Sequence, residues 1–224
     1  MVPRNSHHGV IFDLDGTLLN TLEDLADSMN TVLTRGNLPA HPVSAYRRFV
    51  GDGVTMLVTR ALPEELREES HIARFVRDMR AEYARRWADK TKPYAGVSEL
   101  IRELEARDIP MTILTNKPED AALAMVAHFF PSTNFRTVMG AKPERPRKPD
   151  PTAALEIAAH LELATDRILF LGDSDADMLT ARSAKMTALG AGWGFRGREE
   201  LLRCGAQKVL ESPLEMLDWL GAQP

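Results

Sequence analysis

The chain lacks the cysteines that a disulfide framework would need. Its 224 residues include a single cysteine, Cys204, so no internal disulfide can form. This scarcity fits a reduced compartment, and we expect a cytoplasmic protein. Long apolar runs are also missing, since the first hydrophobic stretch covers only residues 10–12. We therefore expect neither a signal peptide nor a membrane span.

Neither sign of charge is in large excess. The formal net charge is -4, which gives no general attraction for nucleic acid or for anionic lipid. We expect neither as a partner, and any anion that the protein handles must be bound by local features. Hydrophobic residues make up 44% and charged residues 27%, which are ordinary values for a soluble globular protein.

Strand and helix patterns alternate along most of the chain. Alternation of this kind predicts an α/β fold with parallel βαβ units, here a Rossmann-like core. Short apolar strands are expected at 10–12, 111–114, 137–139, 168–171, 187–189 and 208–210. Helices are expected at 97–104, 122–129, 152–161, 176–184 and 213–220.

Residues 19–90 interrupt this alternation. They contain no strong strand signal, and apolar residues at spacings of three and four predict long helices at 22–33 and 72–87. Short apolar runs and two glycines occupy 42–61. We interpret 19–90 as a small inserted helical cap domain, and 1–18 together with 91–224 as the core.

The first strand ends in two aspartates, Asp13 and Asp15, followed by Gly16 and Thr17. Alternate residues of an extended tip project to one side, so we expect the two carboxylates to converge. Converging carboxylates repel unless a cation compensates, and Mg²⁺ prefers such oxygen ligands. Gly16 permits close approach of a ligand. The alternative is a solvated turn, because these residue types also form turns.

Two further polar sites follow later strands or lie on loops. Thr115 and Asn116 come after the strand at 111–114, where a hydroxyl can donate to a phosphoryl oxygen or simply cap a helix. Lys148 lies between prolines in 146–151 and can neutralise a carboxylate and a phosphoryl group. Its alternative is a solvated basic loop.

The strand at 168–171 leads into another acidic segment. Asp173 lies at the strand tip, where it can complete a metal site. Asp177 lies one turn into the next helix, where it can orient metal-bound water or interact favourably with the positive end of the helix dipole.

Taken in this order, these sites resemble the motifs of the haloacid dehalogenase-like hydrolase superfamily. Residues 13–17 resemble its first motif, Thr115 its second, Lys148 its third and residues 172–177 its fourth. The resemblance covers essentially the whole chain. It implies a Rossmann-like core with a helical cap inserted after the first motif.

The resemblance also implies a reaction. Asp13 would attack phosphorus and form an aspartyl-phosphate, while Asp15 would act as general acid and then as general base. Thr115 and Lys148 would hold the phosphoryl group. The family's dehalogenases lack an acid–base aspartate at the position of Asp15, so its presence favours a phosphatase.

The metal and the substrate contacts follow from the same resemblance. Mg²⁺ would bind Asp13, the Asp15 backbone carbonyl and Asp173, with Asp177 beside it. Contacts to the substrate are expected from residues of three segments: Gly16, Thr17, Arg47, Gly51 and Asn116.

Within the superfamily, the chain is most similar to phosphoglycolate phosphatases. The phrases at 12–18, 49–53, 115–118 and 147–151 carry this similarity. It implies a loop at 49–53 over the active site, with Arg47 and Arg48 either meeting a substrate carboxylate or lying on a solvated face.

We therefore expect a monomer or homodimer that hydrolyses a small phosphate ester, and we expect that ester to be 2-phosphoglycolate. Phosphatases of pyrophosphate, sugar phosphates or nucleotides share these similarities. A phosphomutase resembling β-phosphoglucomutase and a non-catalytic binding protein remain as alternatives.

Overall fold

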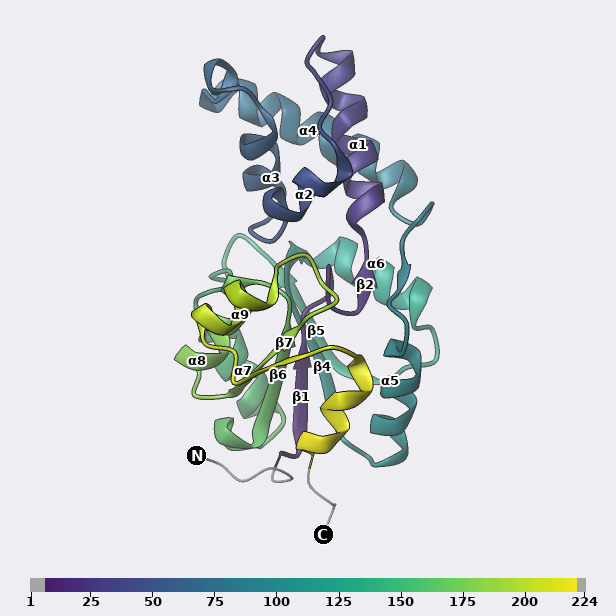
Figure 1. Cartoon of the computed structure of the whole chain (residues 1–224), viewed down its shortest axis with the longest axis vertical. Coiled ribbons are helices and arrows are strands. Elements are labelled where there is room, and N and C mark those ends of the chain that lie inside the picture. Colours follow the sequence, from purple (N-terminus) through teal and green to yellow (C-terminus); the bar gives the residue numbers. More distant parts are fainter. Residues whose placement is uncertain (1–6, 221–224) are drawn as a thin grey trace. The chain divides into compact units, whose positions relative to one another are not determined.

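The computed structural model describes residues 7–220. These residues form two compact units (Figure 1). The core unit consists of the segment up to Leu19 and the segment from Pro93 onward, and the helical unit consists of Asn20–Lys92. The chain passes between the units twice, through β2 (Leu19–Asn20) and β3 (Lys92–Pro93), which pair as a small two-stranded sheet.

The core unit contains a six-stranded sheet in the order β5-β4-β1-β6-β7-β8, and every pair of neighbouring strands is parallel. The predicted α/β fold is thereby confirmed. Phe12 of β1 lies opposite Ile113 of β4 and Leu171 of β6, so these strands end side by side. The strands are β1 (Gly9–Phe12), β4 (Met111–Pro118), β5 (Phe135–Ala141), β6 (Ile168–Gly172), β7 (Thr187–Ala191) and β8 (Lys208–Leu210).

Helices lie on both sides of this sheet (Figure 1). They are α5 (Val97–Ala106), α6 (Glu119–Phe129), α7 (Thr152–His160), α8 (Asp175–Ser183), α9 (Arg198–Cys204) and a 3₁₀ segment, η3 (Pro213–Trp219). On one side, Ile157 of α7 and Met178 of α8 pack in one buried cluster with Ile11 and Phe170. Burial of these apolar side chains stabilises the sheet at the position from which the site residues project.

Two features of the core differ from the sequence prediction. Strand β4 does not end at Leu114 but continues to Pro118, with a register irregularity between these residues. Its polar end is as buried as its apolar beginning, so polarity alone gives the wrong boundary. Helix α9 has no counterpart in the predicted pattern, because it buries only Leu201 and so lacks a recognisable apolar face.

The helical unit contains four α-helices: α1 (Leu22–Arg35), α2 (Val43–Phe49), α3 (Val54–Ala61) and α4 (Glu69–Arg86). The two long helices, α1 and α4, are confirmed, and a short 3₁₀ segment, η1 (Glu64–Leu66), precedes α4. The turn between α2 and α3 has φ of 124° at Gly51 and 86° at Gly53. Positive φ values of this kind are unfavourable for residues with a side chain, which explains why both positions are glycine. Within residues 7–220, no helix has the length and apolar character needed to span a membrane.

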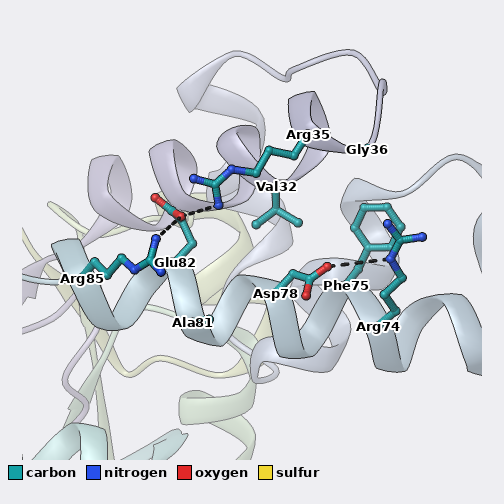
Figure 2. A pocket seen from close by; sticks show the side chains of 9 residues that line it. All are labelled: Val32, Arg35, Gly36, Arg74, Phe75, Asp78, Ala81, Glu82 and Arg85. Atoms are coloured by element: carbon teal, nitrogen blue, oxygen red, sulfur yellow. Dashed lines mark hydrogen bonds and ion pairs between the residues drawn. The ribbon is translucent and has the colours of Figure 1, made fainter.

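A buried glutamate joins α1 to α4. Glu82 is 2% exposed and lies 2.7 Å from Arg35, 2.5 Å from Arg86 and 3.8 Å from Arg85. Burial favours the neutral acid, but the arginines outweigh it and hold the pKa of Glu82 below its usual value. This carboxylate lies at a pocket of about 250 Å³ that Val32 and Phe75 also line (Figure 2). The Arg35–Glu82 ion pair therefore links α1 to α4 at the edge of this polar pocket, while Arg85 and Arg86 contact Glu82 from within α4.

A second buried carboxylate closes the helical unit at its two chain ends. Asp24 of α1 is 1% exposed and accepts hydrogen bonds from Lys90 N at 3.0 Å, Thr91 N at 2.8 Å and Thr91 Oγ1 at 2.7 Å. The start of α1 is thereby tied to the segment that follows α4.

Replacement of Asp24 by Asn is expected to lower the free energy of unfolding by about 2–4 kcal/mol, because buried donors lose a charged acceptor. Asp27→Asn is the control, since Asp27 is 34% exposed and its carboxylate pairs with the half-exposed Lys90 ammonium. The Asp27→Asn replacement should lower the free energy of unfolding by less than about 1 kcal/mol. Urea unfolding of both variants measures the difference, and equal losses would contradict the role of Asp24.

Candidate active site

The polar residues of the candidate site gather at the carboxyl ends of three adjacent strands. Asp13 directly follows β1, Asp173 directly follows β6, and Thr115 lies in the second half of β4. Lys148 comes from the loop between β5 and α7. Open parallel sheets bind their ligands beyond this edge, so the topology brings together residues that are far apart in sequence.

Lys148 lies between two carboxylates. Its Nζ is 2.8 Å from Asp13 Oδ1 and 2.6 Å from Asp177 Oδ1, and its side chain is 3% exposed. Burial would lower the pKa of Lys148, but the charges of Asp13 and Asp177 outweigh it and raise that pKa above its usual value. The lysine is therefore a permanent, fixed positive charge, and the solvated-loop alternative is wrong.

Asp177 is fixed by the start of its own helix. Ser174 caps α8, since its Oγ accepts a hydrogen bond from Asp177 N–H at 3.3 Å. In return, Asp177 Oδ2 accepts from Ser174 Oγ at 2.6 Å and from Ser174 N–H at 3.0 Å. This reciprocal capping box occupies one carboxylate oxygen, and Lys148 occupies the other. Asp177 is thus the charge partner that sets the position of the Lys148 ammonium.

Asp173 is enclosed by two glycines. It is 2% exposed, and its oxygens accept hydrogen bonds from Phe195 N at 2.7 Å and from Thr17 Oγ1 at 3.3 Å. A Cβ at Gly16 would lie 2.2 Å from Asp173 Oδ2, and one at Gly194 would lie 2.2 Å from Asp173 Cβ. Gly16 also has φ of 85°. The glycine of the first motif therefore makes room for the aspartate of the fourth.

Asp13, Asp173 and Asp177 form a buried cluster in which one oxygen of each lies within 4.8 Å of the others. Burial and the charges of Asp177 and Asp15 raise the pKa of Asp13 to about 7, although Lys148 opposes this. Burial, followed by the charges of Asp13 and Asp177, raises the pKa of Asp173 as well. One ammonium does not balance three carboxylates. An all-oxygen set with excess negative charge fits a hard divalent cation.

Asp15 contacts a lysine that its spacing does not indicate. Its two carboxylate oxygens each lie 3.1 Å from Lys117 Nζ. The carboxylate is therefore held by a lysine, and the acidic cluster is completed by Asp173 and Asp177 rather than by Asp15. Lys117 was not among the predicted site residues. The only signal for it is its place in the phrase at 115–118, since a lysine usually indicates a solvated position.

Thr115 and Asn116 do not cap a helix, because α6 begins at Glu119 after Pro118. Thr115 Oγ1 accepts a hydrogen bond from Lys117 N at 3.2 Å. Asn116 binds the backbone of Lys148 twice, donating to its carbonyl at 3.1 Å and accepting from its N–H at 3.0 Å. In this structure Asn116 is thus an anchor for the loop that carries Lys148.

The remaining predicted substrate residues lie in the helical unit. Arg47 and Arg48 are exposed residues of α2, and Gly51 lies in the turn between α2 and α3. The contacts predicted for them with the substrate stay predictions.

Comparison with protein families gives one match that covers most of the chain. The model of the haloacid dehalogenase-like hydrolases matches residues 10–191. This range includes Asp13, Thr115, Lys148 and Asp173, and it spans both the core unit and the helical unit.

Individual relatives are similar over almost their whole length. A phosphoglycolate phosphatase of Rhodospirillum rubrum is 32% identical over 222 residues, which are 95% of this chain and 90% of the relative. One of Psychrobacter arcticus is 28% identical over 217 residues, or 94% of each chain. The crystal structure of a predicted phosphoglycolate phosphatase from Haemophilus somnus has a TM-score of 0.88 at 26% identity, covering 95% of this chain and 97% of that one.

The raised pKa of Asp13 predicts how the stability of the metal-free protein depends on pH. The native carboxyl keeps its proton up to about pH 7, whereas the unfolded one loses it near 3.8. Between these values the native state binds more protons, so stability falls as pH rises through this window. We expect a loss on the order of a few kcal/mol.

Thermal melting from pH 5 to pH 8, with a chelator present, measures this slope. Asp13→Asn should remove the Asp13 contribution to this slope and leave that of Asp173, whereas Asp27→Asn should retain the wild-type slope. An Asp13→Asn variant with the same pH dependence of melting as the wild-type protein would contradict the burial of Asp13 as an unbalanced acid.

Proposed function

Since this chain belongs to the haloacid dehalogenase-like hydrolase family and is a phosphoric monoester hydrolase, we propose that it cleaves a small phosphate monoester through an aspartyl-phosphate on Asp13. The observation that carries this proposal is the buried ion pair of Asp13 with Lys148, beside Asp173 and at the carboxyl end of the sheet.

In the first step, an Asp13 oxygen bonds to phosphorus while the bond from phosphorus to the leaving oxygen breaks. Asp15 gives its proton to that oxygen, and the alcohol departs. In the second step, Asp15 takes a proton from water, the water oxygen attacks phosphorus, and inorganic phosphate leaves Asp13. A carboxylate nucleophile thus divides one difficult hydrolysis into two displacements.

The charge of the site suits this reaction. A phosphate dianion and the Asp13 carboxylate repel each other, and phosphoryl transfer depends mainly on alignment and on neutralising such charge. Lys148, whose position is fixed by Asp177 and Asn116, brings one positive charge to this point. Thr115, at the end of β4, is the proposed hydroxyl donor to the phosphoryl oxygens, together with the backbone of Gly16 and Thr17.

The same site supports a metal ion of the kind that this family uses. Asp13, Asp173 and the backbone carbonyl of Asp15 would hold Mg²⁺, with Asp177 close by. When bound, Mg²⁺ supplies the positive charge that the three carboxylates lack.

We propose 2-phosphoglycolate as the substrate and residues 19–90 as the cap that selects it. The names of the two curated relatives support this choice, since their similarity extends through the helical unit as well as the core. Arg47 of α2 is the proposed partner for the substrate carboxylate, and the turn at Gly51 is the proposed closing loop.

Replacement of Asp13 by Asn should reduce phosphate release in the presence of Mg²⁺ at least a thousandfold, because an amide is a poor nucleophile at phosphorus. Malachite-green detection of phosphate measures this loss, and circular dichroism checks the fold. Asp150→Asn is the control: Asp150 is exposed on the loop that carries Lys148, and this variant should keep wild-type activity. Full activity in Asp13→Asn would exclude the proposed nucleophile.

The substrate is tested by kcat/KM across phosphoglycolate, pyrophosphate, nucleotides and glucose 1-phosphate. We expect phosphoglycolate to rank first, and we expect Arg47→Gln to raise its KM about tenfold while the exposed control Arg77→Gln leaves it unchanged. Formation of glucose 6-phosphate from glucose 1-phosphate would instead indicate a mutase. A better substrate elsewhere in the panel would reject phosphoglycolate without affecting the role of Asp13.

A further inference from the structure

We propose that Lys117 is a positioning residue for Asp15, which holds the acid–base carboxylate where it meets the leaving oxygen. This inference rests on the role of Asp15 in the proposed function. The pair is symmetric, since Lys117 Nζ lies 3.1 Å from each carboxylate oxygen of Asp15. The lysine side chain is 6% exposed and the aspartate side chain 15% exposed, so bulk water screens this contact only weakly.

The backbone of Lys117 is held in place both at its own N–H and at the next residue. Its N–H donates to Thr115 Oγ1 at 3.2 Å, and Pro118, the next residue, pairs with Ala141 of β5. Strand β4 therefore continues past its last apolar residue and carries the lysine into the site. An ammonium that is buried on a rigid strand costs free energy unless a partner compensates it, and here that partner is Asp15.

Asp15 itself is attached to a less regular segment. It lies in the turn after β1, where its backbone forms an isolated bridge with Leu19. The buried carboxylate of Asp13, two residues away in the chain, repels that of Asp15. A fixed ammonium that contacts both of its oxygens counteracts this repulsion and restricts the side chain to one rotamer. Errors of about 1 Å in the placement of a catalytic group can cost about a hundredfold in rate.

The two lysines of the site consequently serve different carboxylates. Lys148 contacts Asp13, the proposed nucleophile, and Lys117 contacts Asp15, the proposed acid and base. Both depend on the end of β4, because Asn116 holds the backbone of Lys148 and the next residue is Lys117 itself. A short segment of one strand thus sets the distance between the two reacting carboxylates.

A role in positioning the general acid predicts a dependence on the leaving group. An alkyl alkoxide must be protonated as it departs, whereas 4-nitrophenolate leaves without a proton. The parameter kcat/KM reports the first irreversible step, in which the alcohol departs. Lys117→Met should therefore lower kcat/KM about 10- to 100-fold for 2-phosphoglycolate and for 2-hydroxyethyl phosphate, whose alcohol is uncharged. For 4-nitrophenyl phosphate the loss should be less than about threefold.

Four further variants complete the experiment. Lys117→Arg keeps the charge and two donors and should recover most of the lost rate, while Lys117→Gln serves if the Met variant does not fold. Lys185→Met replaces an exposed lysine of the same unit and should leave all three substrates unchanged. Asp15→Asn should show the same dependence on the leaving group as Lys117→Met, but larger.

The outcomes separate the two proposals. Equal losses in kcat/KM on all three substrates in Lys117→Met would overturn the proposal that Lys117 positions Asp15. A rise in KM confined to 2-phosphoglycolate would also overturn it, because Lys117 would then be a ligand for the substrate carboxylate. If the loss in kcat/KM depends on the leaving group in Asp15→Asn but not in the Lys117 variants, only the inference about Lys117 fails. If Asp15→Asn lacks this dependence, the acid–base role in the proposed function fails first.

Discussion

The site depends on one buried contact, in which the Lys148 ammonium is shared between Asp13 and Asp177. Without this charge, three carboxylates would lie together in a region that water reaches poorly, and mutual repulsion would favour their protonation. With it, Asp177 is satisfied by Lys148 and by the cap of α8, so Asp13 and Asp173 carry the unbalanced charge. The attraction for a cation is therefore directed to these two aspartates.

The close packing of this cluster imposes conditions on the surrounding backbone. Side chains are excluded at Gly16 and Gly194 by Asp173, and at Gly172 by Asp177, whose Cβ would be 2.3 Å from a Cβ placed there. The three glycines come from separate segments, yet each is needed for the same reason. Acidic groups fixed this closely rely on a rigid backbone, which the parallel strands β1 and β6 supply.

The fold was largely predictable from the sequence because its strands are short apolar runs that end in polar turns. Prediction failed where a buried segment is polar, as at the end of β4, and where a helix lacks an apolar face, as in α9. Asp13, Lys148 and Asp173 were predictable as a set from their order along the chain. The partners of Asn116 and Lys117 were not, because the contacts span 32 and 102 residues of sequence and nothing local indicates them.

The buried charges also argue that this arrangement exists for chemistry rather than for stability. Removing carboxylates and ammonium groups from water costs several kcal/mol for each ion, and well-packed apolar side chains of similar volume are often as stable or more stable. The end of β4 illustrates the point: three of the strand's first four residues are apolar, and an apolar side chain in place of Lys117 would suit the same buried strand. A lysine there serves the proposed reaction by holding the Asp15 carboxyl group in one orientation, which an acid and base acting in alternation requires.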